Sequence, residues 1–285
     1  MHTDTATVPP PAAPGPAAHE NPAAQPLPAV PLLPGHQSTQ AERTAFRALA
    51  GSVWDRQAAA ATRAFTRMPA LRGHDQEATR ADLVALLLYL RMPDGPLGHG
   101  ELDRCLRAGD PRLLPYAACV ASALRRMPSF RGPVLRGAGP SGTGKPPAPA
   151  PGTVLRDPAP VSALPGDGRG PSPASARYAI WSVTGRRVRQ LSDGTGPTAR
   201  HDEVVFAPGT AFRVLDVRAG GPSPLLLLRE LPAGSAAAPA GHAQPDDRDR
   251  AVLARLDEAL RQRPSGAAAF DWPGRCAGPV GSSGQ

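Results

Sequence analysis

The stretch from Tyr178 to Leu231 decides the fold that we expect for this chain. It reads YAIWSVTGRRVRQLSDGTGPTARHDEVVFAPGTAFRVLDV over residues 178–217 and ends in PLLLLREL at 224–231. Short runs rich in Val, Ile, Leu and Phe are separated by Gly, Pro and Asp, a pattern typical of β-strands joined by turns. The segment therefore predicts a sheet.

One carboxylate stands out within this stretch. Glu203 comes directly before the strand-like run 204–206. A charged side chain at the head of a buried strand costs free energy unless it is solvated, paired or used in chemistry. From the residues alone, Glu203 is as consistent with a charge that keeps an exposed strand edge soluble as with a catalytic carboxylate. The neighbouring Asp202 weakens any claim that Glu203 alone has a functional role. His201 would share the face of Glu203 if the strand began there, but a lone histidine of this kind is more often a solvated loop residue.

Helical patterns precede the sheet. Thr39 and Glu42 form a capping box that opens a helical pattern running to Arg67. Further helices are predicted from Asp75 to the turn at 93–95, over 100–107, and from 110–111 to the residue before Pro128.

Strand candidates then follow, and one helix closes the pattern. The candidates are the short apolar runs 134–135, 154–155, 178–182, 188–191, 203–206, 211–217 and 225–228, and residues 246–261 have the period of an amphipathic helix. Helices first and strands afterwards predict an α+β fold. We expect a disordered Pro/Ala-rich segment (1–37), a helical subdomain (38–128), a β core (129–232), a linker (233–245), a C-terminal helix (246–263) and a flexible tail (264–285).

The composition argues against nucleic acid as a partner. The formal charge is +8, but Lys145 is the only lysine, and the arginines are scattered with few aromatic residues between them. Stacking platforms for bases are therefore scarce, and we expect no nucleic-acid partner. A basic interaction protein that binds nucleic acid stays an alternative. Its affinity for nucleic acid should then fall as the salt concentration rises.

The cysteines and the apolar runs limit the setting of the protein. Cys105, Cys119 and Cys276 are odd in number and lack the spacing of metal ligands, so we expect no disulfide framework and no metal. We expect no secretory signal at the start of the chain. The longest apolar run, 83–90, is far shorter than the roughly 20 residues that span a bilayer. We expect a soluble protein with no membrane partner, cytoplasmic or exported by a route without a cleavable signal peptide.

Two further polar residues lie at the ends of strand-like runs. Arg136 ends the run 133–137, where its planar guanidinium would suit a diphosphate, although a surface arginine is the commoner explanation. Ser162 follows the short strand 153–156 and, taken alone, is a turn serine.

Taken in order, these residues resemble the arginine-specific ADP-ribosyltransferase family, in its Arg–Ser–Glu clade, and are similar to actinobacterial members. Three stretches carry the resemblance: LRRMPSFRGPVLRG at 124–137, GTVLRDPAPVSAL at 152–164, and residues 178–215 with HDEVVFAPGTAF. Together they cover about residues 110–231. The resemblance implies a split β-sandwich packed on the helical subdomain.

The resemblance also implies roles. Arg136 would hold the phosphates of NAD, Ser162 would orient the nicotinamide ribose, and Glu203 would bind the ribose hydroxyl and stabilise the positive charge that forms as nicotinamide leaves. His201 would lie near the acceptor. The implied function is that of an NAD-dependent protein mono-ADP-ribosyltransferase, with NAD as substrate, no metal, and an unidentified protein acceptor whose modified residue is a candidate arginine.

Two departures from the family pattern motivate an alternative. The Ser-Thr-Ser motif becomes Ser162-Ala163-Leu164, and the first acid of Glu-x-Glu becomes His201. A neutral imidazole pairs with an acceptor guanidinium less well than a carboxylate does. A binding or interaction module that has lost transfer chemistry is therefore the second hypothesis.

Overall fold

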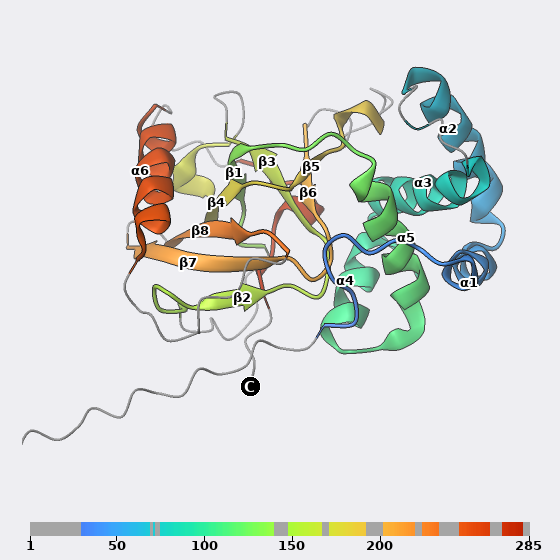
Figure 1. Cartoon of the computed structure of the whole chain (residues 1–285), viewed down its shortest axis with the longest axis horizontal. Coiled ribbons are helices and arrows are strands. Elements are labelled where there is room, and N and C mark those ends of the chain that lie inside the picture. The colour runs from blue at the N-terminus through green and yellow to red at the C-terminus, as the bar shows by residue number, and fades with distance from the viewer. Residues whose placement is uncertain are drawn as a thin grey trace, which may run out of the picture.

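The computed structural model of the chain describes residues 30–68, 71, 75–139, 148–166, 171–191, 202–219, 224–233, 245–262 and 270–281. Helices α1–α5 lie on one side of a sheet and α6 lies on the other (Figure 1). The helices are α1 (Gln40–Ala50), α2 (Val53–Arg67), α3 (Gln76–Arg91), α4 (His99–Arg107), α5 (Leu114–Arg125) and α6 (Asp247–Arg261). The strands are β1 (Gly132–Arg136), β2 (Val154–Arg156), β3 (Val161–Pro165), β4 (Tyr178–Ser182), β5 (Arg186–Arg187), β6 (Val204–Phe206), β7 (Ala211–Arg218) and β8 (Leu225–Leu231). The α+β prediction is confirmed.

The first helical pattern is two helices rather than one. The predicted capping box is present, with Thr39 accepting from the backbone of Glu42 and Glu42 accepting from the backbone of Thr39. The prediction of one helix to Arg67 is wrong, because Gly51 adopts a φ of 49° and ends α1. Glycine takes such a left-handed φ without steric cost, so the chain turns there before α2 begins.

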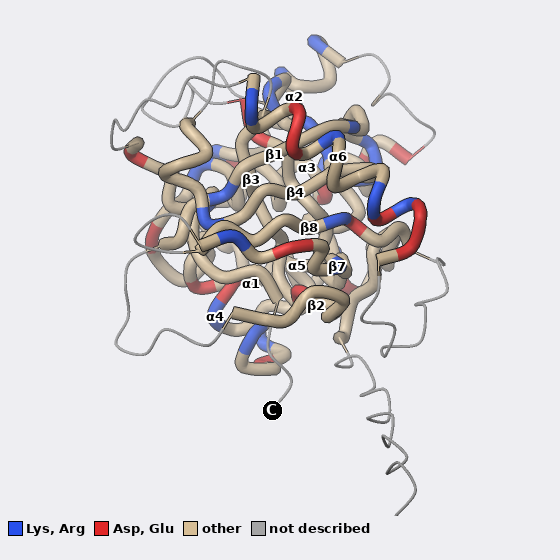
Figure 2. Tube along the Cα trace, turned by 90° about the vertical axis from the view of Figure 1, so that its left-hand side faces the viewer, with Lys and Arg blue, Asp and Glu red and all other residues tan. Residues whose placement is uncertain are grey.

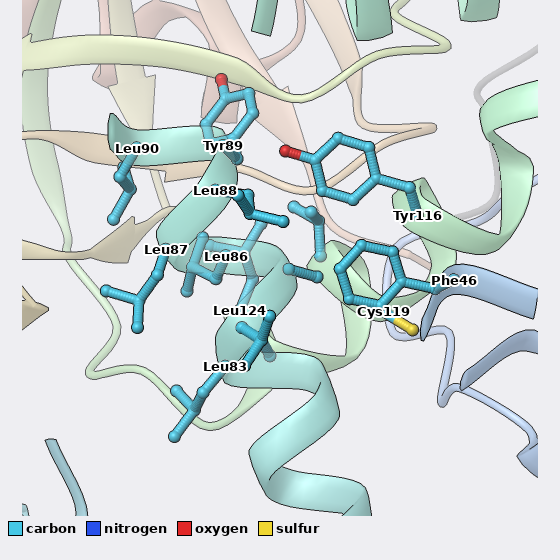
Figure 3. Close-up of a cluster of buried hydrophobic side chains, with 14 of the residues drawn as sticks. Phe46, Leu83, Leu86, Leu87, Leu88, Tyr89, Leu90, Tyr116, Cys119 and Leu124 are labelled. Atoms are coloured by element: carbon cyan, nitrogen blue, oxygen red, sulfur yellow. The ribbon is translucent and has the colours of Figure 1, made fainter. Parts of the chain in front are cut away.

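Helix α3 is the centre of the helical region. Its residues 81–90 are all buried, as expected of a helix in which every one of them except Asp82 is apolar. Phe46 of α1 stacks on Tyr116 of α5 with ring centroids 5.3 Å apart, and Figure 3 shows both rings beside the α3 leucines. The helices therefore share one apolar core, which also includes Val205 of β6.

Asp82 is a buried acid that joins three segments of this region. Its two carboxylate oxygens accept from Ser38 and from Ser122 of α5, each at 2.6 Å. Burial raises the pKa of Asp82, and the two hydroxyl donors oppose that rise. The carboxylate thus ties the segment before α1 to α3 and α5.

Replacing Asp82 separates the hydrogen bonds from the charge. We expect Asp82→Ala to lower the free energy of unfolding by about 1–3 kcal/mol, because two buried hydroxyls lose their acceptor. Asp82→Asn should cost less, since its amide oxygen still accepts and no charge is buried. Urea unfolding measures both, and a larger loss for Asp82→Asn than for Asp82→Ala would contradict this account.

The eight strands form one hydrogen-bonded sheet in the order β2-β7-β8-β4-β1-β3-β6-β5. Only the β4–β8 pair is parallel among the described pairs. Phe206 of β6 meets Phe212 of β7 edge to face at 5.1 Å, although these strands are far apart in the sheet order. The two halves of the sheet therefore pack against each other, as the predicted sandwich requires.

Alternate residues of the sheet face two different cores. Val134, Ile180 and Leu228 belong to the core between the halves. Leu135, Ala179 and Leu227, each the immediate neighbour of one of these residues in its strand, pack with α6 instead. This alternation is the period of two that a strand imposes on its side chains.

One predicted strand is wrong. Residues 188–191 contain the 3₁₀ turn Arg189–Leu191, and the strand of this region is β5, just before it. Val188 and Leu191 are both buried in the helical core. Residues three apart in a helical turn lie on one side, which explains how both apolar side chains reach that core.

The predicted disordered N-terminal segment and the predicted flexible C-terminal tail both contain packed residues. Residues 1–29 lie outside the described part of the chain. Within the rest of the predicted segment, Leu32 is buried and Nε2 of His36 lies 3.0 Å from Oε1 of Glu42. The expected flexible tail is also wrong for residues 270–281, where Cys276 and Val280 are buried. The other predicted domain limits stay predictions.

Opposite charges are interspersed over the described chain. Figure 2 shows basic and acidic residues alternating, most clearly along α6. Among the described helices, none has the length and apolar character needed to cross a membrane. The same residues contain no group of three or more His, Cys, Asp or Glu side chains placed to hold a metal ion.

Candidate functional site

Three of the four predicted site residues come from neighbouring strands. Arg136 ends β1, Ser162 lies in β3, and Glu203 directly precedes β6, and these three strands are adjacent in the sheet. The three residues are 4%, 0% and 2% exposed. His201 lies outside the described residues. The sheet thus brings a guanidinium, a hydroxyl and an acid into one buried region.

Ser162 is a strand residue, not the turn serine that its local sequence suggests. It pairs with Val205 of β6, and β3 is covered by a strand on each side. Every residue of β3 is buried, so the strand lacks the alternating polar pattern that would have revealed it. The Ser162 hydroxyl lies 2.9 Å from the hydroxyl of Tyr89.

Tyr89 is a site residue that the sequence analysis missed. It lies near the end of α3, and its apolar neighbours make it indistinguishable from a core residue in the sequence. Burial raises the pKa of Tyr89, while its hydrogen bond with Ser162 and the charges of Arg275 and Arg136 oppose that rise. The phenol is therefore a neutral partner that fixes the hydroxyl of Ser162.

The guanidinium of Arg136 is surrounded by carbonyl oxygens. Its Nη1 donates to the carbonyl of Ser162 at 2.6 Å and also to that of Arg275. Its Nη2 donates to Ala277 at 2.8 Å and its Nε to Gly278 at 3.1 Å. Three of these four acceptors belong to the C-terminal segment. The guanidinium of Arg136 thus donates hydrogen bonds to oxygen atoms in several directions.

Glu203 forms a buried ion pair with the same segment. Arg275 donates from Nη2 to Oε1 at 2.7 Å and from Nε to Oε2 at 3.2 Å. Burial would lower the pKa of Arg275, but the charge and hydrogen bonds of Glu203 raise it above its usual value. The two-point pairing supplies the compensation that two buried charges need.

The segment 270–281 is the largest part of the site that the sequence analysis missed. Around its 3₁₀ turn Gly274–Cys276 it has no helical or strand period that would predict packing. The signal that was present is compositional: Phe270, Trp272, Cys276 and Val280 are apolar residues within a Pro- and Gly-rich stretch. Trp272 lies over Gly137, where an added Cβ would come within 2.7 Å of the indole ring. Glycine at 137 is therefore required for this contact.

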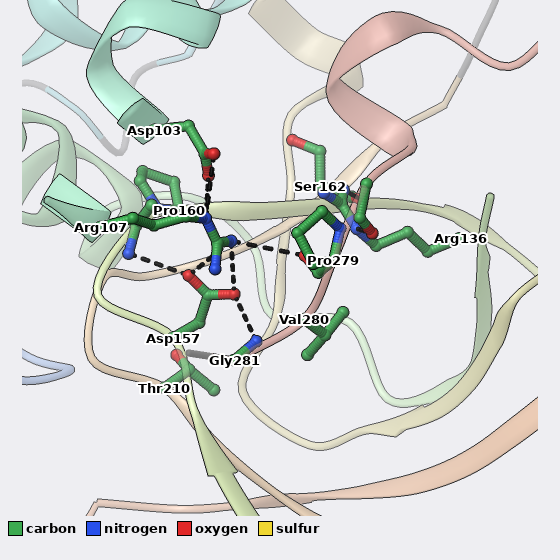
Figure 4. Close-up of polar contacts among 12 residues, drawn as sticks. Asp103, Arg107, Arg136, Asp157, Pro160, Ser162, Thr210, Pro279, Val280 and Gly281 are labelled. Carbon is green, nitrogen blue, oxygen red and sulfur yellow. Dashed lines mark hydrogen bonds and ion pairs between the residues drawn. The ribbon is translucent and has the colours of Figure 1, made fainter. Parts of the chain in front are cut away.

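Asp157 fixes the far end of that segment. Its carboxylate accepts from Nη2 of Arg107 at 2.9 and 3.0 Å, from the amide of Ala159 at 3.0 Å and from the amide of Gly281 at 2.8 Å. Figure 4 shows Arg107 and Gly281 converging on Asp157. The acid is completely buried. It connects α4, the loop before β3 and the C-terminal segment.

Comparisons of the whole architecture with solved structures give clear matches. The type III effector XopAI from Xanthomonas axonopodis pv. citri is similar with a TM-score of 0.54 and 20% identity, over 69% of this chain and 85% of that chain. The ADP-ribosyltransferase HopU1 of Pseudomonas syringae pv. Tomato DC3000 is similar with a TM-score of 0.50 and 16% identity, over 69% of this chain and 99% of that chain. The chain has the ADP-ribosyltransferase fold. No protein-family model matches the sequence, and no curated protein matches it.

The predicted resemblance is thus confirmed at the level of the ADP-ribosyltransferase fold. At these identities a likeness carries the architecture and not the chemistry, because one fold hosts many activities. Arginine specificity, the relation to actinobacterial members and the roles of the site residues stay predictions.

Proposed function

We propose that the protein is an NAD-dependent ADP-ribosyltransferase that transfers ADP-ribose to a protein side chain, with arginine as the candidate acceptor. The observation that carries the proposal is the convergence of Arg136, Ser162 and Glu203 in one buried region of an ADP-ribosyltransferase fold. In this proposal Arg136 binds the diphosphate, Ser162 orients the nicotinamide ribose and Glu203 is the catalytic acid residue. His201 stays the candidate residue near the acceptor.

The chemistry needs one fixed negative charge. When the N-glycosidic bond breaks, its electron pair goes to the nicotinamide nitrogen, which leaves neutral, and positive charge develops on the ribose. The carboxylate of Glu203 opposes that charge in a region from which water is excluded. The acceptor nitrogen then bonds to the ribose carbon and loses a proton to solvent. If water takes the place of the acceptor, the product is free ADP-ribose.

The present partners of these side chains support the fit of NAD. Arg136 donates to the carbonyl oxygens of Arg275, Ala277 and Gly278, which stand where the diphosphate oxygens of NAD would accept hydrogen bonds. Glu203 is bound to a cation, the guanidinium of Arg275, and the nicotinamide ribosyl end of NAD is also cationic. Tyr89 keeps the Ser162 hydroxyl within the buried region. The charge pattern of the site is therefore complementary to NAD.

The proposal is tested by incubating the full chain with NAD labelled in the ADP-ribose part and measuring two products. We expect free nicotinamide to appear, and label to become attached to protein when an arginine-rich acceptor is added. NAD should be supplied at millimolar concentration, because Arg275, Ala277 and Gly278 already bind the Arg136 guanidinium that NAD would need. If nicotinamide is released but no label becomes attached to protein, the activity is NAD hydrolysis and not transfer.

Arg136→Lys tests the diphosphate role. Lysine keeps the charge but loses the planar fork, so we expect NAD to bind about 10- to 100-fold more weakly, since a hydrogen bond to a charged group contributes about 1.5–3 kcal/mol. Calorimetry measures the dissociation constant. The matched control is Arg131→Lys, an exposed arginine before β1, which should bind NAD as the wild type does. Equal affinities for all three proteins would remove Arg136 from the NAD site.

The second candidate is an ADP-ribosyltransferase-fold module that binds a partner without transfer chemistry. The observation that favours it is that Arg136 and Glu203 are both already bonded within the chain. NAD binding by calorimetry without any nicotinamide release would support this module over the transferase.

A further inference from the structure

We propose that residues 270–281, here called the C-terminal strap, are an intrasteric inhibitor that must leave before NAD binds. The proposal rests on the proposed function, because it assigns the strap to the NAD site.

The strap occupies the groups that NAD would need. Every nitrogen of the Arg136 guanidinium donates to a strap carbonyl, and both oxygens of Glu203 accept from Arg275. Arg275 is 6% exposed and Cys276 is completely buried, so the strap fills the region rather than lying over it. NAD cannot bind Arg136 and Glu203 while these contacts persist.

The strap imitates the charge pattern of the substrate. It offers oxygen atoms to the cation of the site and a cation to the acid of the site, which is the order in which NAD offers its diphosphate and its nicotinamide ribosyl end. A segment that only completed a hydrophobic core would not need an arginine at 275. The buried charges of Arg275 and Glu203 compensate each other only when the strap is bound. Arg275 is therefore the residue that holds the strap in this position.

The remaining polar contacts of the strap are spread along its length. Gly137 donates from its amide to the carbonyl of Cys276 at 2.9 Å and accepts from Gly278 at 3.2 Å. The indole of Trp272 donates to the carbonyl of Ser175 at 3.1 Å, and Gly281 donates to Asp157 at 2.8 Å. Two of these contacts join backbone groups, one joins the Trp272 side chain to a carbonyl and one joins an amide to a carboxylate, and among the described residues the strap's one β-bridge is Gly137–Ala277. Such an attachment can be released without unfolding the sheet.

Two variants loosen the strap by independent means. Arg275→Ala removes the cation and leaves Glu203 buried without it. Gly281→Leu acts at the other end, where φ is +78° and an added Cβ would come within 2.7 Å of Leu155. The matched control is Arg250→Ala on α6, which removes an exposed arginine paired with Asp247.

Cysteine alkylation reports whether the strap has left. Cys276 is buried in the strap, whereas Cys105 and Cys119 are buried in the helical region and serve as internal controls. We expect iodoacetamide to modify Cys276 at least about tenfold faster in both loosened variants, because modification needs the open state and follows its population. Peptide mapping by mass spectrometry should show no change at Cys105 or Cys119.

NAD affinity then tests the inhibition itself. We expect both variants to bind NAD at least about tenfold more tightly than the wild type, since a ligand that needs a minor open state binds with an affinity reduced by that population. By linkage, saturating NAD should speed the alkylation of Cys276 in the wild type. Arg250→Ala should match the wild type in both measurements.

The outcomes separate this proposal from the proposed function. If Cys276 becomes reactive in the variants but NAD binding and nicotinamide release stay at the wild-type level, the strap is not an inhibitor and the transferase proposal stands. If Cys276 becomes reactive and no protein binds NAD, the proposed function fails and the inhibition fails with it. If Cys276 stays unreactive in both variants, the segment is a fixed part of the fold and the proposal is overturned.

Discussion

Glu203→Gln is expected to reduce the rate of nicotinamide release by about 10²- to 10³-fold, the usual effect of removing one preorganised electrostatic group from an active site. Glutamine keeps the shape and one oxygen acceptor but loses the negative charge that opposes the cationic ribose. NAD binding should change much less than turnover, because the charge develops only as the glycosidic bond breaks. Single-turnover release of nicotinamide at saturating NAD measures this effect.

The control for Glu203→Gln must account for its partner. The substitution leaves the buried Arg275 without a counter-charge, so a loss of activity could reflect loss of fold. The double variant Glu203→Gln/Arg275→Gln has no buried charge at either position and should fold while staying inactive. Asp202→Asn changes the adjacent, partly exposed acid and should keep wild-type turnover. Activity in the double variant would exclude Glu203 as the catalytic group.

Asp157→Ala is expected to lower the free energy of unfolding by about 3–5 kcal/mol, the usual cost of breaking a buried ion pair by removing one partner. The substitution takes away the acceptor of Arg107 and also that of the Ala159 and Gly281 amides. Chemical denaturation of the full chain measures the loss. Activity is not the measurement, because Asp157 contacts no proposed substrate group.

Asp103→Ala is the matched control for Asp157. Asp103 also pairs with Arg107, at 2.9 Å, but its side chain is 39% exposed. Exposed pairs of this kind contribute about 0.2–1 kcal/mol. A loss of stability as large as that of Asp157→Ala would show that burial is not the reason for the effect.

Periodicity made the architecture predictable. The apolar residues of α3 and α6 recur at helical spacing, and the strands of the stretch from Tyr178 to Leu231 are bounded by turn residues. The failures have local causes. Gly51 ends a helix within a continuous helical pattern, and β3 is covered on both sides and so shows no alternation. Neither feature has a periodic signal to detect.

The candidate site was predictable where a motif marks it. Glu203 and Glu230 are both buried acids of the β core, but Glu230 accepts from the backbone amide of Thr184 at 2.8 Å and fixes a turn. Composition and spacing do not separate the two residues, whereas the sequence around Glu203 did so through its family resemblance. Tyr89 and the C-terminal strap escaped because their partners lie more than 70 residues away in the chain. Long-range contacts of single residues leave no local pattern.

The hydroxyl contact between Tyr89 and Ser162 bears on how this protein can be divided. A residue of α3 supplies the partner of a residue in the middle of the sheet, so the helices form one side of the proposed NAD site. A β core expressed without them would expose the hydroxyl of Ser162 and the buried Val205 to water. Helical and β regions of this architecture should therefore be exchanged between relatives only as one block.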